Sequence, residues 1–162
     1  MSHKLEPRLE WQGFKAVAPD ANAALQSFTR AASARGLDKV LLELVKIRAS
    51  QINGCAFCLQ MHLDDARKLP VDEVKLNLVV AWREAPVFSE RERAALGWTE
   101  ALTLLPQGVS DTVYAEARAA FSEQELADLS TAIIAINAWN RLGVAYRFTP
   151  MVHGTAAKQK AS

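Results

Sequence analysis

The chain has 162 residues, a formal net charge of +1, and a composition in which half of the residues are hydrophobic. This length suffices for a sizeable core, and we expect a single domain over residues 1–162. No apolar run approaches the roughly 20 residues that cross a bilayer, and no helix shows a long basic face, so we expect neither membrane nor nucleic acid binding. The first residues lack the apolar stretch of a signal peptide, which predicts a soluble cytoplasmic protein.

Helical periodicity runs along almost the whole chain, and no stretch of alternating β-branched residues predicts a strand. We therefore expect an all-α fold, a compact bundle of about seven helices. After an irregular head, the expected helices cover residues 19–34, 39–52, 55–69, 71–82, 89–105, 110–121 and 122–148.

Capping residues mark several of these boundaries. Gly36 follows the first expected helix as a C′ glycine would, and Asp38 is placed to cap the second. Asn53-Gly54 ends that second helix. The segments 89–92 and 122–125 both have the Ser-x-x-Glu pattern of a capping box, so each predicts a helix start.

The last expected helix carries more apolar side chains than one surface stripe needs, which predicts a central position in the bundle. These side chains are Ile133, Ile134, Ile136, Trp139, Leu142, Val144 and Tyr146. Burial between subunits would explain the excess as well as burial within one chain, so the pattern also allows a homo-oligomer.

Both cysteines of the chain lie in the short segment 53–62, together with His62. A helix that starts near Cys55 would place Cys55, Cys58 and His62 on one face within about two turns. A Cys-x-x-Cys pair can close a disulfide across one turn, and a helix N-terminus lowers the pKa of a thiol. Since His62 can move protons as the sulfurs change state, the segment favours a redox site.

Other interpretations of the two cysteines explain less. A closed structural zinc site needs four ligands, and the chain has no second Cys-x-x-Cys or histidine pair, so we expect no metal. Free cysteines are often buried as small hydrophobes, but burial alone does not explain their spacing. A purely structural disulfide here would close too small a loop to restrict the unfolded chain. The other histidines, His3 and His153, lie near the chain ends and are expected to be solvated.

Glu43 lies inside the apolar run 40–45, on the helix that precedes the cysteines. A carboxylate in such a stripe lies either at its polar edge or in a site where it faces a partner. The periodicity does not decide between the two positions.

Glu43, Cys55, Cys58 and His62 form one longer pattern, in which eleven residues separate Glu43 from Cys55 and three separate Cys58 from His62. This pattern resembles the signature of the alkylhydroperoxidase D group within the carboxymuconolactone decarboxylase superfamily. The flanking segments 45–54 and 137–141 fit as well, so the resemblance covers most of the chain.

The resemblance implies an all-helical AhpD-like fold, assembled as trimers or hexamers, that reduces hydroperoxides with a cysteine pair and no cofactor. Matched position by position, Cys58 would be the peroxidatic cysteine, Cys55 the resolving one, and His62 with Glu43 the proton relay. A thiol or dihydrolipoyl-type molecule would donate the electrons. This chain carries Phe57 where the best-known member of the group has a further histidine between its cysteines.

Two questions stay open at this point. Helix position alone favours Cys55 as the thiol of lower pKa, whereas the resemblance implies that Cys58 attacks the peroxide. Two alternative functions also remain: a decarboxylase-like enzyme that uses His62 as its base, and a non-catalytic redox or metal sensor.

Overall fold

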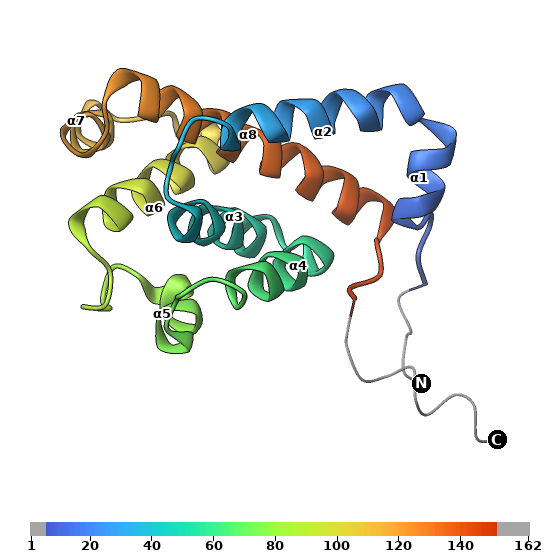
Figure 1. Ribbon diagram of the computed structural model, residues 1–162, viewed down its shortest axis with the longest axis horizontal. Helices are drawn as coiled ribbons and strands as arrows, with labels where there is room; N and C mark the ends of the chain where they lie inside the picture. The colour runs from blue at the N-terminus through green and yellow to red at the C-terminus, as the bar shows by residue number, and fades with distance from the viewer. Residues whose placement is uncertain (1–5, 152–162) are drawn as a thin grey trace.

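A computed structural model describes residues 6–151, and all regular structure within them is helical (Figure 1). The all-α prediction is therefore confirmed. His3 and His153 lie outside the described residues. Eight α-helices and two short 3-10 helices follow one another in the described chain: α1 (Trp11–Val17), α2 (Pro19–Ser33), α3 (Lys39–Asn53), α4 (Ala56–Ala66), α5 (Glu73–Leu78), η1 (Val79–Ala81), α6 (Glu90–Thr103), η2 (Leu105–Gln107), α7 (Asp111–Ala120) and α8 (Glu123–Tyr146).

The helix starts predicted at Asp38, Ser89 and Ser122 are capped as expected, whereas α2 ends at Ser33 and Gly36 lies one residue beyond the C′ position. Asp38 Oδ1 accepts a hydrogen bond from the Leu41 backbone N–H at 2.8 Å, which fixes the start of α3. Ser89 and Ser122 each form a complete capping box with the glutamate three residues further on, at the starts of α6 and α8.

The structure contains one α-helix that the sequence pattern does not predict. α1 occupies the supposedly irregular head, and its first residue follows Glu10, whose side chain provides no cap. Contacts with the far end of the chain hold it in place, because the backbone N–H groups of Arg8 and Leu9 both donate to the Tyr146 carbonyl. The Phe14 ring also packs 5.8 Å from the Tyr146 ring, centroid to centroid. Tertiary packing thus stabilises a helix that is too short to form by itself.

Two of the predicted helices depart most from expectation. α4 ends at Ala66. After it, backbone hydrogen bonds join residues three positions apart, from Lys68 N to the Asp65 carbonyl and from Leu69 N to the Ala66 carbonyl. The helix expected over residues 71–82 divides into α5 and the 3-10 helix η1.

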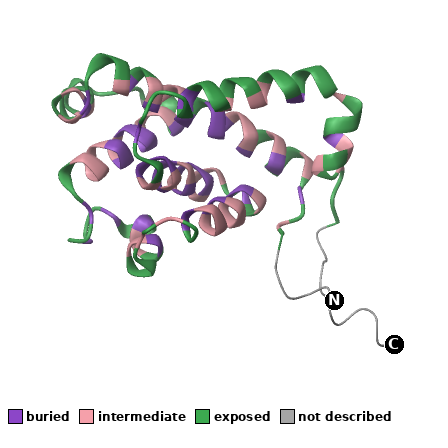
Figure 2. Cartoon of the chain, in the orientation of Figure 1, coloured by how far each residue is buried: buried purple, intermediate pink, exposed green. Residues whose placement is uncertain are grey.

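α3 and α8 form the centre of the bundle. α3 packs against α4, α6 and α8, and α8 in turn packs against α2, α4, α6 and α7. Figure 1 shows α2 lying alongside α8, and Figure 2 shows buried residues concentrated on α3 and on the inner faces of α6 and α8. The central position predicted for the last helix is confirmed. Ile134 and Val144 on α8 nevertheless remain 52% and 45% exposed, so a single chain does not bury all the apolar side chains of this helix.

A small apolar cluster surrounds the cysteines where α3, α4 and α8 meet. Trp139 packs against this cluster from α8, and its indole Nε1 donates to Thr29 Oγ1 at 3.0 Å. The cluster consists of Ala49, Cys55, Cys58 and Ile136, with Phe57 and Trp139 packed against it. Within residues 6–151, no helix combines the length and the apolar character needed to cross a membrane.

Candidate active site

Cys55 lies in the sharp turn between α3 and α4. Gly54 ends α3 in the left-handed conformation, with φ 69° and ψ 28°, which glycine adopts without a steric penalty. Cys55 is then the N-cap residue of α4, and its Sγ accepts a hydrogen bond from the Cys58 backbone N–H at 3.3 Å. The helix therefore begins at Ala56, one residue later than expected, and Cys55 is its cap residue.

The two sulfurs nevertheless lie side by side. Cys55 Sγ and Cys58 Sγ are 2.6 Å apart, both residues are 2% exposed, and both are free cysteines. A disulfide bond measures about 2.05 Å, so a small movement of the side chains would close it. The predicted pairing of the two thiols is thus geometrically sound.

The surroundings favour a thiolate on Cys55. The hydrogen bond with the Cys58 side chain lowers the pKa of Cys55 to about 7 against the opposing effect of burial, and the N–H groups of Cys58 and Phe57 and the Asn140 side chain contribute to the lowering. The pKa of Cys58 is raised, because its sulfur is hydrogen-bonded to Cys55, buried, and close to the charge on Cys55. The reduced pair therefore holds its negative charge on Cys55, as the helix-position argument predicts.

Gly143 of α8 forms the wall behind the sulfur pair. A Cβ atom at this position would lie 2.6 Å from Cys55 Sγ and 3.5 Å from Cys58 Sγ. Only a residue without a side chain allows α8 to approach the cysteines this closely.

A cavity of about 250 Å³ borders Cys55, between the start of α4 and the end of α8. Phe57, Val144 and Phe148 give it apolar walls, and Arg147 adds a positive charge. Cys55 lines this cavity and Cys58 does not, so a molecule that entered here would meet Cys55 first.

Glu43 faces a partner and does not lie at the polar edge of its helix. Its Oε2 lies 2.8 Å from His62 Nδ1, and its Oε1 accepts a hydrogen bond from Lys46 Nζ at 2.7 Å. Burial by itself would raise the pKa of Glu43, but the hydrogen bond from His62 and the charge and hydrogen bond of Lys46 outweigh burial and lower the pKa. Glu43 is therefore a carboxylate that holds its negative charge inside the fold.

The Glu43–His62 pair and the sulfur pair are close but not joined. Among the described residues, no hydrogen bond connects Glu43 or His62 to either sulfur. Ile136 is near both pairs, because it belongs to the cysteine cluster and also lines a cavity of about 20 Å³ beside His62. That volume can accommodate one water molecule.

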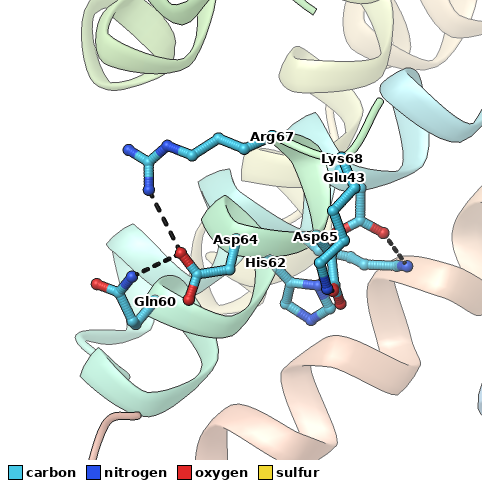
Figure 3. A network of polar contacts seen from close by, with 8 residues as sticks. Glu43, Gln60, His62, Asp64, Asp65, Arg67 and Lys68 are labelled. Atoms are coloured by element: carbon cyan, nitrogen blue, oxygen red, sulfur yellow. Dashed lines mark hydrogen bonds and ion pairs between the residues drawn. The ribbon is translucent and has the colours of Figure 1, made fainter. Parts of the chain in front are cut away.

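One group of side chains in the described part of the chain could hold a metal ion, and it does not include the cysteines. Ligand atoms of Glu43, His62 and Asp65 all lie within 4.8 Å of one another. Figure 3 shows His62 together with Glu43 and Asp65, whereas Asp64 turns towards Gln60. Two ammonium groups already neutralise the carboxylates of this group, since Lys46 Nζ bonds Glu43 and Lys68 Nζ bonds Asp65.

Sequence analysis alone assigned no role to Asn140 or Gly143. Both lie on α8 more than eighty positions from Cys55 along the chain, and only the fold brings them to the sulfurs. One signal was available for Asn140, because it stands in a largely apolar helical segment, where an amide requires polar partners.

Comparison with known proteins identifies the family. The fold is that of the alkylhydroperoxidase D-like proteins. A model of the carboxymuconolactone decarboxylase family matches residues 19–101, which include all four side chains. The chain belongs to this family, within its alkylhydroperoxidase D-like group.

Individual relatives agree with this assignment. The uncharacterized protein YdfG of Bacillus subtilis is 37% identical over 130 residues, which cover 80% of this chain and 88% of YdfG. A crystal structure from Agrobacterium tumefaciens has a TM-score of 0.86 and 37% identity, and covers 91% of this chain and 99% of its own. That protein has an unknown function and is described as a suggested antioxidant defence protein, AhpD. An uncharacterized peroxidase-related protein of Ralstonia eutropha, described as an alkylhydroperoxidase AhpD core, shares the fold with a TM-score of 0.75 and 20% identity, over 85% of this chain and 74% of its own.

Proposed function

We propose that this protein reduces hydroperoxides with the Cys55–Cys58 pair, which cycles between a dithiol and a disulfide. The observation that carries the proposal is the 2.6 Å contact between two buried sulfurs at a helix N-terminus that favours a thiolate. The family supports an AhpD-like or carboxymuconolactone decarboxylase-like activity, and the suggested antioxidant role of the Agrobacterium protein favours the AhpD-like one.

The chemistry needs three balanced steps. First, a thiolate attacks one oxygen of the hydroperoxide, the O–O bond breaks, the sulfur becomes a sulfenic acid, and the leaving alkoxide takes a proton to form an alcohol. Second, the neighbouring thiol attacks the sulfenic sulfur, so that an S–S bond forms and water leaves. Third, an external thiol or dihydrolipoyl-type donor reduces the disulfide and is itself oxidised to a disulfide.

We further propose that Cys55 is the thiolate that meets the peroxide and that Cys58 resolves the sulfenic acid. The lowered pKa of Cys55 and the cavity beside it support this order. Resemblance to the family implies the reverse order, with Cys58 attacking. The two orders predict opposite behaviour for single Cys→Ser variants, so they can be separated by experiment.

In this proposal the Glu43–His62 pair supplies and receives the protons. The carboxylate of Glu43 orients the imidazole by accepting from Nδ1, which leaves Nε2 to exchange a proton with the leaving group. Assembly into a homo-oligomer, a trimer or hexamer by resemblance, is part of the same proposal. The exposed Ile134 and Val144 on α8 support it, because a second chain would cover them.

A titration tests the proposal directly. Reduced protein is treated with cumene hydroperoxide, and free thiols are counted together with the disulfide mapped by mass spectrometry. We expect two thiols to be lost per chain, with a Cys55–Cys58 disulfide as product. Unchanged thiols at excess peroxide would overturn the proposal.

The variant in which both cysteines are serine provides the control. It should consume no peroxide. Enzyme activity that survives in this variant would point instead to a decarboxylase-like enzyme with His62 as base, and stoichiometric bound metal in the purified protein would point to a sensor.

A further inference from the structure

A buried network of side-chain amides connects α8 to the cysteine turn. Asn140 is 0% exposed and Asn137 is 7% exposed. Asn53 Nδ2 donates to Asn137 Oδ1 at 2.9 Å and to Asn140 Oδ1 at 3.0 Å. Asn140 Nδ2 in turn donates to Ser50 Oγ at 3.0 Å.

Two neighbouring groups fix the orientation of the Asn137 amide, because one can only accept a hydrogen bond and the other can only donate one. The Ile133 carbonyl can only accept, so Asn137 must present Nδ2 to it, at 2.9 Å. Arg141 can only donate, and its Nη1 lies 3.2 Å from Asn137 Oδ1. Asn137 therefore turns its oxygen towards Asn53.

The orientation passes from one amide to the next. Because Asn137 offers an oxygen, Asn53 must present Nδ2, and the same Nδ2 meets the oxygen of Asn140. Asn140 is then left with both of its N–H donors on the side away from Asn53. Ser50 takes one of them. Asn140 also lies one helical turn before Gly143, the α8 residue that closely approaches both sulfurs, and its side chain acts to lower the pKa of both thiols.

We propose that Asn140 is a thiolate-stabilising residue, and that Asn53 and Asn137 are positioning residues that keep its N–H donor aimed at the cysteine pair. A neutral amide held in the opposite orientation would turn its oxygen towards the sulfurs and repel a thiolate. A fixed donor instead stabilises the charged sulfur. In this proposal the Ile133 carbonyl acts on the cysteine pair indirectly, through the orientation of the amides.

This inference deepens the proposed function, but it can be tested without peroxide turnover. Reduced protein is alkylated with iodoacetamide across a range of pH, and mass spectrometry identifies the modified cysteine. In Asn140→Ala the midpoint of Cys55 alkylation should move to higher pH, with a rate at pH 7 about tenfold lower than that of the wild type. Asn140→Asp should move the midpoint further, because a carboxylate oxygen replaces the donor.

A second variant keeps the test decisive if changes at the buried Asn140 prevent folding. Asn53→Ala removes the amide that orients Asn140 and leaves the sulfurs untouched, so the midpoint should rise by a smaller amount. Asn77→Ala, on the exposed surface of α5, should leave the midpoint unchanged. An unchanged midpoint in folded Asn140→Ala, or in Asn53→Ala if Asn140→Ala does not fold, would overturn the inference.

The two proposals fail in different ways. A shifted alkylation midpoint without peroxide consumption would support the role of Asn140 and refute the proposed peroxidase activity. Peroxide consumption with an unshifted alkylation midpoint would support the proposed peroxidase activity and refute the role of Asn140.

Discussion

The His62 Nδ1 atom lies 2.8 Å from Glu43 Oε2, and this contact joins two helices, α3 and α4, across the cysteine turn. It explains why a carboxylate is tolerated in an apolar stripe: the imidazole hydrogen-bonds one of its oxygens, and the Lys46 ammonium hydrogen-bonds the other and neutralises the charge.

Replacing Glu43 by glutamine tests the proton relay. Glu43→Gln keeps the shape of the side chain and removes its charge, so peroxide turnover should slow about 10²-fold or more, the effect of losing a positioned acid or base, while the fold is retained. Turnover is measured with cumene hydroperoxide and a dithiol donor, and circular dichroism checks the fold. Glu84→Gln, on the exposed segment after η1, is the control and should be silent. A wild-type rate in Glu43→Gln would mean that the Glu43–His62 pair has only a structural role.

Single cysteine variants decide which sulfur attacks. With Cys55 as the attacking thiolate, Cys58→Ser should react once with peroxide and stop at a sulfenic acid on Cys55, and Cys55→Ser should be inert. One equivalent of peroxide and a dimedone-type trap, followed by mass spectrometry, locates the adduct. An adduct on Cys58 in Cys55→Ser, with none on Cys55 in the other variant, would restore the order that the family implies.

The pH dependence of alkylation tests the charge on the sulfur pair. The pKa of Cys55 lies at about 7, below the ordinary thiol value of 9.0, so its thiolate fraction should rise as pH increases through 7 and level off well before pH 9. The same sign applies to stability: the reduced fold gains stability as pH rises from about 7 to 9 and loses that gain as pH falls back through 7. An alkylation midpoint near 9 would mean that the turn does not stabilise a thiolate.

Adding one methyl group at Gly143 should disturb the pair directly. The new Cβ of Gly143→Ala would lie 2.6 Å from Cys55 Sγ, so either α8 or the cysteine turn must move. We expect a loss of about 1–3 kcal/mol in the free energy of unfolding, typical of overpacking, together with slower disulfide closure. Urea denaturation and thiol titration measure the two effects.

Gly97→Ala is the matched control, because its Cβ would meet nothing closer than Trp82 Cη2 at 3.8 Å. That variant should be neutral or stabilising, since alanine is favoured over glycine within a helix. Equal effects at the two glycines would show that the close approach at Gly143 has no importance.

Local signals in the sequence predict most of the fold and half of the site. Asp38, Ser89 and Ser122 mark helix starts because a cap depends on neighbours within one turn. α1 has no such mark, and contacts with Tyr146, at the other end of the chain, determine it. The short Cys55–Cys58 distance follows from local spacing.

The remaining half of the site depends on the exact turn geometry and on long-range packing. Cys55 becomes a cap residue and not a helical one because Gly54 takes the left-handed conformation, and the sequence pattern does not distinguish these two starts. Asn140 reaches the sulfurs only through the packing of α8 against α3 and α4.

Trp139 offers an optical consequence of the way α8 packs on the cysteines. Its indole ring is packed against the cluster that contains both sulfurs, and a hydrogen bond to Thr29 fixes its orientation. Disulfides quench indole fluorescence at contact distance more strongly than thiols do. Of the four tryptophans in the chain, Trp139 should therefore emit less when Cys55 and Cys58 form a disulfide and recover when a donor reduces it, so that the change in total emission follows the cycle in real time.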